Sequence, residues 1–286
     1  MRFRWAVFFL AAATLVTPNV LRGTGAPAFV EFPFEFRAGL NWLEVHLEGN
    51  CEPLNFLLDS GANISVLHEQ TARRLAVKLG KRVKVHGVGV ETTGYWPQKL
   101  RARVGPVLLP KEYLVVDLTK LSEACLCTVD GLVGRDFIDG RVVQIDYPEH
   151  KIRLLAHPPA ATCATILPLR RSAGGFQVPV RVNGETPRWV RLDTGCASAL
   201  QWTVSDLVDN ETSDSISVGL TQLAIPVIPT AVELGGLRFE NVLTGLHTKN
   251  IFPGEPGLLG NRLLAKFRVT LDTVHGLLVL EEAPAR

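Results

Sequence analysis

Hydrophobic and polar residues alternate along one stretch in each half of the chain. Residues 43–48 read Leu-Glu-Val-His-Leu-Glu, and residues 178–183 read Val-Pro-Val-Arg-Val-Asn. A period of two is typical of a half-buried β-strand. A glycine-containing turn and a second, mostly apolar stretch follow each of them, at Leu54–Leu58 and Trp189–Leu192. The pattern therefore predicts a strand hairpin in each half and a mostly β protein.

Both of the second apolar stretches lead into an aspartate, a small hydroxyl residue and a glycine. The two motifs are Asp59-Ser60-Gly61 and Asp193-Thr194-Gly195. A carboxylate on a tight turn after a strand is held by the backbone, and the glycine lets main-chain donors approach it. For one such aspartate, an ordinary turn residue is as good an interpretation as a catalytic one. Two in the same context favour a facing pair of carboxylates suited to acid–base catalysis.

Further landmarks follow the two motifs in the same order. Gly131-Leu132-Val133-Gly134 comes after the first and Gly257-Leu258-Leu259-Gly260 after the second. An aspartate lies 15 residues beyond each leading glycine, Asp146 in the first half and Asp272 in the second. We interpret Asp146 as structural, because it lies downstream of the glycine landmark and outside the loop. The shared order and spacing indicate an internal duplication.

These motifs resemble the aspartic protease superfamily, in which Asp-Ser/Thr-Gly is followed in the same lobe by two apolar residues and a glycine. The short halves and the run Gly131–Ile138 look more like retropepsin-type bacterial aspartyl proteases than long pepsins. The resemblance covers about residues 30–281. It implies a mostly β fold of two aspartic-protease β-barrel lobes, with a cleft between them and few short helices.

The resemblance also implies a role for each motif residue. Asp59 and Asp193 would be the catalytic pair of an aspartic endopeptidase, activating a water for attack on a peptide bond without a cofactor. The hydroxyl groups would hydrogen-bond across to the partner loop, and a serine in place of one threonine should weaken that grip slightly. The residues supporting the active loops would be Ser60, Gly61, Thr194 and Gly195.

Two carboxylates a few ångströms apart do not both ionise easily, so the pair should share one proton. Which aspartate holds the proton is left open, because the titration belongs to the pair. We expect the substrate to be an extended peptide or protein segment held by main-chain hydrogen bonds. The chain is expected to be a monomer whose lobes pair within the molecule. The alternative is a non-catalytic peptide- or partner-binding protein on the same scaffold.

Other hydrolase chemistry has less support. Ser60 does not lie in the Gly-x-Ser-x-Gly motif of a serine hydrolase. No histidine has a motif that would pair it with Cys196 for thiol catalysis. We therefore interpret Cys196 as a small buried side chain of the active loop.

A segment after the first motif resembles the flap that closes over substrate in this family. Apolar residues at helical spacing predict a helix over 68–79, with Gly80 as its stop signal. A strand at 83–90 and a polar turn with aromatic residues at 91–96 follow. In the second half, two prolines within 223–229 favour an edge strand or loop, so we expect a single flap. A plain surface hairpin is the alternative, and the flap residues would be Gly87, Gly89, Gly94 and Tyr95.

The N-terminus has the pattern of an export signal. Arg2 and Arg4 precede an apolar run that is too short for a membrane span, and small residues allow cleavage after Ala28. We expect a periplasmic or secreted protein with no other membrane span, or one tethered by an uncleaved leader. The expected division is a signal peptide at 1–28, lobes at 29–157 and 163–286, and a proline-rich linker at 158–162.

Composition adds little to this picture. The 286 residues are 47% hydrophobic, enough for two small cores, and a net charge of +2 gives no argument for a nucleic-acid partner. Basic residues between 73 and 84 have no interleaved aromatics that would stack on bases. No His or Cys cluster has zinc-ligand spacing, so no metal is expected. The pairing of the five cysteines stays open; they are Cys51, Cys125, Cys127, Cys163 and Cys196.

Overall fold

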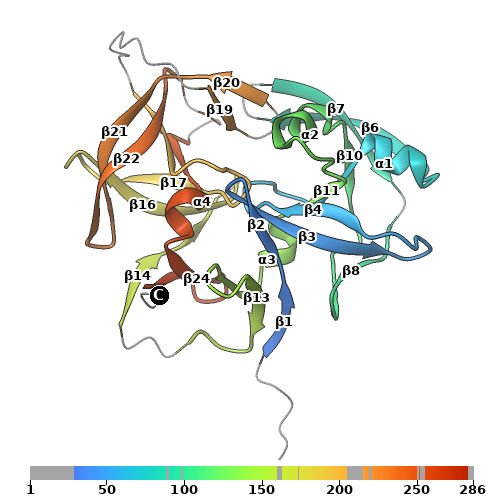
Figure 1. The fold of residues 1–286 in the computed structure, drawn as a ribbon, viewed down its shortest axis with the longest axis horizontal. Helices are drawn as coiled ribbons and strands as arrows, with labels where there is room; N and C mark the ends of the chain where they lie inside the picture. The colour runs from blue at the N-terminus through green and yellow to red at the C-terminus, as the bar shows by residue number, and fades with distance from the viewer. Residues whose placement is uncertain are drawn as a thin grey trace, which may run out of the picture.

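In a computed structural model, the chain forms two β-rich halves joined by a shared sheet (Figure 1). The structure describes residues 29–87, 90–97, 99–159, 163–172, 174–204, 215–218, 221–249, 251 and 255–282. The predicted signal peptide at 1–28 and residues 160–162 of the predicted linker lie outside them. Within the described ranges, the mostly β fold with few short helices is confirmed. No helix in those ranges is long and apolar enough to cross a bilayer.

The first half is built on a 10-stranded sheet with the order β6-β7-β10-β5-β11-β4-β3-β8-β9, to which β2 adds by pairing with β3. Its strands are β2 (Glu35–Arg37), β3 (Leu40–Leu47), β4 (Leu54–Leu58), β5 (Val66–His68), β6 (Leu79–Gly87), β7 (Val90–Pro97), β8 (Ala102–Val104), β9 (Val107–Leu108), β10 (Leu114–Val116) and β11 (Gly131–Val133). Two helices accompany it, α1 (Glu69–Arg74) and α2 (Thr119–Cys125). The predicted strand hairpin is β3–β4.

The second half is built on a 7-stranded sheet with the order β15-β16-β17-β23-β18-β22-β21. Its strands are β15 (Arg170–Arg171), β16 (Phe176–Val182), β17 (Arg188–Leu192), β18 (Leu200–Thr203), β21 (Val227–Leu234), β22 (Leu237–His247) and β23 (Gly257–Leu259). A separate two-stranded hairpin consists of β19 (Ser215–Val218) and β20 (Thr221–Ala224). The predicted hairpin of this half is β16–β17.

A third sheet of six strands takes strands from both halves, in the order β1-β13-β12-β24-β25-β14. Its strands are β1 (Phe29–Pro33), β12 (Val142–Asp146), β13 (Lys151–Leu155), β14 (Ala164–Pro168), β24 (Phe267–Asp272) and β25 (Leu277–Glu282). The short helices α3 (Arg135–Ile138) and α4 (Asn261–Leu264) lead into β12 and β24. Because β12 pairs with β24, this sheet fixes one half against the other. One apolar core runs through both halves, from Phe32 and Phe137 to Leu192 and Phe267.

The two larger sheets place corresponding strands side by side. In the first half β11 lies between β4, to which it is parallel, and β5, to which it is antiparallel; β5 is in turn parallel to β10. In the second half β23 lies in the same way between β17 and β18, and β18 is parallel to β22. The loops after β4 and β17 therefore occupy corresponding positions.

Two local predictions in the first half are wrong. The helix expected over 68–79 ends at Arg74, and Gly80 lies within β6. A side chain at Gly80 would meet the carbonyl oxygen of Trp96, so the glycine there serves close approach of β6 and β7 and does not stop a helix. The polar turn expected at 91–96 is part of strand β7.

The second half has a hairpin that the sequence did not predict. β19–β20 lies between β18 and β21, which is the place that β6–β7 occupies in the first half. The β20 strand lies against α2 of the first half (Figure 1). The prolines at 226 and 229 fall at the junction with β21 and within it, so they do not prevent the hairpin before them. Each half therefore has a hairpin at this place in the chain, and the expectation that only the one in the first half works as a flap stays a prediction.

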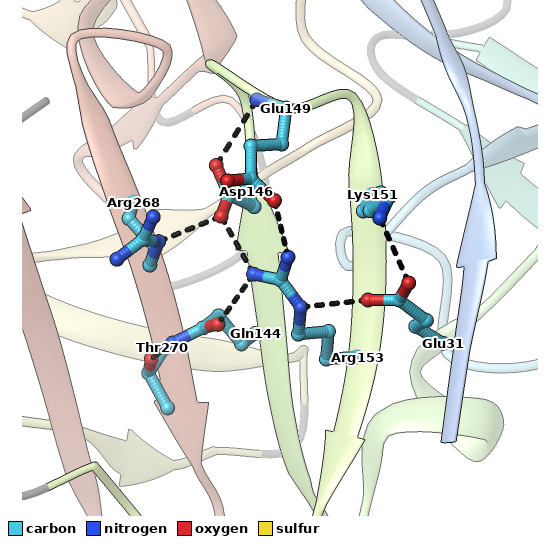
Figure 2. Close-up of polar contacts among 8 residues, drawn as sticks. All are labelled: Glu31, Gln144, Asp146, Glu149, Lys151, Arg153, Arg268 and Thr270. Atoms are coloured by element: carbon cyan, nitrogen blue, oxygen red, sulfur yellow. Dashed lines mark hydrogen bonds and ion pairs between the residues drawn. The ribbon is translucent and has the colours of Figure 1, made fainter. Parts of the chain in front are cut away.

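A buried ion network stabilises the shared sheet (Figure 2). The Asp146 side chain is fully buried and accepts hydrogen bonds from Arg153 Nη1 at 2.6 Å and Arg268 Nε at 2.7 Å. Although burial raises the pKa of Asp146, these two guanidinium groups hold it below its ordinary value. Arg153 comes from β13 and Arg268 from β24, so this carboxylate joins strands of both halves. The structural interpretation of Asp146 agrees with this position.

We predict that Asp146→Ala destabilises the protein by about 3 kcal/mol, because it leaves two partly buried arginines without their shared anion. Denaturant unfolding measures the change. The control is Glu149→Gln, which removes a half-exposed partner of Arg153 and should change stability by less than about 1 kcal/mol. Equal effects of the two substitutions would contradict this account of the sheet.

Candidate active site

Strands β4 and β17 deliver Asp59 and Asp193 to facing loops. The Asp59 backbone N–H donates to Val133 O at 2.9 Å, and the Asp193 N–H donates to Leu259 O at the same distance. The glycine-flanked apolar pairs of the sequence are thus the strands β11 and β23, which pack alongside the loops. Since these strands are buried, both aspartates start from rigid backbone.

Four hydrogen bonds lock the two loops together. Ser60 Oγ donates to Leu192 O at 2.8 Å, and Thr194 Oγ1 donates to Leu58 O at 2.8 Å. Each hydroxyl also accepts the backbone N–H of the other, at 2.9 Å for Ser60 N and 3.0 Å for Thr194 N. Ser60 and Thr194 are fully buried, so every one of these bonds is shielded from water. The cross-loop bonds expected from the sequence are present with serine on one side and threonine on the other.

The two glycines of the motifs lie over the opposite carboxyl groups. A Cβ added to Gly61 would lie 2.6 Å from Asp193 Cγ, and one added to Gly195 would lie 2.5 Å from Asp59 Cγ. No side chain fits there, so glycine is required for the approach of the loops. The same segments supply main-chain donors: Gly61 and Ala62 N–H to Asp59 Oδ1 at 2.9 and 3.1 Å, and Gly195 N–H to Asp193 Oδ1 at 2.9 Å.

The carboxyl groups of Asp59 and Asp193 are close enough that each affects the pKa of the other. Burial, followed by the adjacent charge of Asp59, raises the pKa of Asp193 to about 8. Burial raises the pKa of Asp59 as well, but the Gly61 and Ala62 N–H groups act against it. Asp59 accepts two backbone donors and Asp193 one, so the negative charge is better supported on Asp59. The pair can therefore hold one proton, with Asp193 as its favoured carrier.

Cys196 lies directly after the second loop and is 1% exposed. Its Sγ lies 3.0 Å from Ser198 Oγ, and burial raises the pKa of this thiol to about 12. A thiol with that pKa is protonated at neutral pH and is a poor nucleophile. The interpretation of Cys196 as a small buried side chain fits these properties.

Hairpin β6–β7 covers an apolar layer next to the first loop, which we call the cleft-side cluster. Val83 and Val85 of β6 are half-buried against it. Its buried members are Leu40, Trp42, Leu57, Val66, Leu114, Val116, Leu118, Leu121, Val129 and Leu132. Ala62 and Ala197, one from each active-loop segment, also contact it. This layer thus lies between the hairpin and the aspartate loops.

The predicted flap residues occupy different parts of the hairpin. Gly87 pairs with Val90 at its tip, and Gly89 lies outside the described residues. Gly94 lies at the base, where a Cβ would press on Val85 and on the backbone of β10. Tyr95, beside it, packs against the main core of the molecule. Substrate contact by these residues stays a prediction.

The second half carries polar side chains where the first half has the cleft-side cluster. Leu57 and Arg191 occupy the same register, opposite Leu132 of β11 and Leu258 of β23. Val66 and Gln201 likewise correspond, on β5 and β18. Gln201 donates to Ser198 Oγ at 2.8 Å, and its Oε1 lies 2.7 Å from a ring nitrogen of His247.

Arg191 and Glu255 form an ion pair in this polar layer, with Nε donating to Oε2 at 2.5 Å. Neither residue was predicted from the sequence. The available signal was an arginine between two apolar residues, two positions before Asp193. Among the described residues, no group of three or more His, Cys, Asp or Glu side chains is arranged to hold a metal ion.

We predict that Thr194→Val destabilises the protein by about 3 kcal/mol, because it leaves the Ser60 N–H and Leu58 C=O buried without partners. Urea unfolding measures the loss. As a control, Thr93→Val removes a hydroxyl that accepts from Arg82 near the surface and should cost less than about 1 kcal/mol. A Thr194→Val protein as stable as wild type would be inconsistent with a tight lock between the loops.

We predict that wild-type stability contains a component that declines as pH rises from about 4 to about 8. In this window the folded state retains the Asp193 proton, whereas an unfolded aspartate with a pKa of 3.8 has lost it. The folded state then binds more protons than the unfolded state, so the free energy of unfolding falls as pH rises. Melting temperatures at several pH values test this. Asp193→Asn should flatten the decline, and an unchanged slope in that variant would argue against it.

Comparison with known proteins gives two similarities. A family model described as aspartyl protease matches residues 43–137, which include Asp59 and the glycine-flanked strand β11. A retrovirus-related Pol polyprotein from transposon 412 of Drosophila melanogaster is 26% identical over 122 residues, 42% of this chain. The match spans only 10% of that polyprotein's length. With two such loops facing each other on a mostly β scaffold, these similarities support an aspartic protease superfamily member, at low identity and with the family match confined to the first half.

Proposed function

We propose that the protein is an aspartic endopeptidase that hydrolyses peptide bonds with a water activated between Asp59 and Asp193. The observation that carries the proposal is the placement of these two interacting carboxyl groups on facing loops that are locked together by their own hydroxyls. Two buried carboxyl groups in contact repel each other when both are ionised. A fold that holds them together in this way supports a shared proton and a catalytic role.

The proposed reaction uses the two carboxyl groups in different protonation states. Ionised Asp59 takes a proton from the water, whose oxygen attacks the carbonyl carbon of the substrate. Protonated Asp193 donates its hydrogen bond, then its proton, to the oxygen of the tetrahedral intermediate. As the C–N bond breaks, the leaving nitrogen receives the proton that Asp59 took from the water, and a hydroxyl group of the tetrahedral intermediate gives its proton to Asp193 as the new carbonyl forms. The two aspartates return to holding one proton, and no covalent intermediate or cofactor is needed.

The proposed substrate is a peptide in extended conformation between hairpin β6–β7 and the aspartate loops. Among the described strands, β6 is the last in its sheet, and we propose that its outer edge offers main-chain groups to an added strand. The cleft-side cluster would take apolar side chains of that peptide. Because each half supplies one loop, a single chain contains both aspartates, which supports a working monomer.

We predict that Asp59→Asn and Asp193→Asn each reduce peptide cleavage by about a thousandfold, in the range expected for loss of an acid–base group. The assay is cleavage of a peptide library by the chain from residue 29 onward, from pH 3 to pH 8. Wild-type activity should be blocked by a statine-type inhibitor and should fall as pH rises through about 8, where Asp193 loses its proton. Asp117→Asn, a change at an exposed carboxyl that contacts Thr119, is the control that should retain full activity.

Two results would contradict the proposal. Full activity of either active-loop variant would exclude the pair as the catalytic machinery. A folded wild type that binds peptides and cleaves none at any pH would instead indicate a non-catalytic peptide-binding protein on this scaffold.

A further inference from the structure

Arg191 is a cation buried beside the aspartate pair. It lies on β17, two residues before Asp193, and its side chain is 5% exposed, as is that of its partner Glu255. Arginine and glutamate are rarely buried to this extent unless they are paired. Taking both charges out of water is costly, and an apolar pair of similar volume often serves stability equally well. The position therefore calls for a reason other than folding.

Two nitrogens of the Arg191 guanidinium group donate hydrogen bonds to different partners. Nε donates to Glu255, while Nη1 donates to the carbonyl oxygen of Gly61 at 2.8 Å. Gly61 belongs to the loop of the other half. Its N–H donates to Asp59 Oδ1, and its Cα lies against the carboxyl group of Asp193. Arg191 thus holds the glycine that contacts both aspartates.

The first half shows that the fold does not require an arginine at this place. The corresponding residue is Leu57, which is 1% exposed and lies in the cleft-side cluster. The neighbouring chain in the second half is shaped for the ion pair. A Cβ at Gly174 would collide with both Glu255 Oε1 and Arg191 Nη2. The pair is therefore a feature of one half only, built into its packing.

We propose that Arg191, anchored by Glu255, is a positioning residue that fixes the first aspartate loop from the opposite half and supports the singly ionised state of the pair. This inference rests on the proposed endopeptidase function and adds a residue to it. Arg191 also makes the two sides of the site chemically unequal, because the corresponding residue of the first half is the uncharged Leu57.

The charged groups around Arg191 come from several elements. Asp59 and Asp193 lie on the active loops, and Glu255 precedes β23. On α3, Arg135 donates to Ser172 O and Asp136 accepts from Ser65 Oγ. Burial raises the pKa of both catalytic carboxyl groups, and the positive charge of Arg191 acts in the opposite direction on each of them. Its removal should therefore raise both.

The decisive variant is Arg191→Leu/Glu255→Leu, which copies the leucine of the first half and leaves no unpaired buried charge. Arg191→Lys keeps a positive charge but loses the two-edged guanidinium. The control is Arg181→Leu, which breaks the half-exposed pair with Glu233 on β16 and β21 of the same sheet. The measurements are kcat and KM against pH, melting temperature, and the pH titration of the two catalytic carboxyl ¹³C signals, assigned with the Asp→Asn variants.

The double variant should have a melting temperature close to that of wild type. The acidic and the basic limb of its activity–pH profile should both shift to higher pH, by about one pH unit. We expect kcat to fall tenfold or more, with a smaller change in KM, since the residue does not touch substrate. Arg191→Lys should keep the wild-type pH dependence of activity, but its kcat should be lower than that of wild type. The control should match wild type throughout.

The inference would be overturned if the double variant had the kcat, the pH dependence of activity and the carboxyl titration of wild type. The ion pair would then be a structural feature. If the double variant does not fold, Arg191→Lys decides, because wild-type kcat in that variant also overturns it. A wild type without cleavage would refute the proposed function. The carboxyl titration of folded wild type and double variant would then still decide the role of Arg191, with unchanged titration refuting it.

Discussion

Contact between two acidic groups that repel each other is the constraint that the rest of this structure serves. Asp59 and Asp193 are brought close together in a buried site, and burial raises the pKa of each above its ordinary value. Such contact persists only if stronger interactions around it hold the loops in place. The crossed bonds of Ser60 and Thr194, the main-chain donors of the loops and the shared sheet provide them. The two carboxyl groups are thus in an unfavourable arrangement, which the interactions of the surrounding fold offset.

The two halves contribute to this site in matching and in unmatched ways. Both supply an aspartate after a buried strand, a glycine over the opposite carboxyl group, and a hydroxyl that crosses to the other loop. The electrostatic surroundings differ. Asp59 accepts two loop N–H groups and Asp193 one, and an arginine lies near the pair on the second half where a leucine lies on the first. A symmetrical scaffold therefore gives two carboxyl groups with unequal tendencies to ionise.

The sequence predicted the elements that depend on local pattern and on repetition. Strands β3, β4, β16 and β17 follow from alternation and apolar runs, and the facing loops follow from motifs with shared downstream landmarks. The sequence pattern gave wrong or missing predictions where contacts between residues far apart in the chain determine the local structure. Gly80 looked like a helix stop, yet it is required by the approach of Trp96 across a hairpin. The hairpin β19–β20 had no clear signal in its own sequence.

Arg191 and Glu255 escaped prediction for a similar reason. They are 64 residues apart in the chain, and only the assembled sheet brings them together beside the first loop. Their pairing and the bond to Gly61 depend on the register of β17 against β23 and on room left by Gly174. A charged residue in an apolar strand marks such a site, but its partner is visible only in three dimensions.

Neutron diffraction from crystals grown near pH 6 would test the central claim most directly, by locating hydrogen between the two carboxyl groups. That pH lies below the pKa of about 8 for Asp193. The account predicts one shared deuteron, bound to Asp193 and donated to an ionised Asp59. Two bare carboxylates, or a deuteron on each, would contradict it.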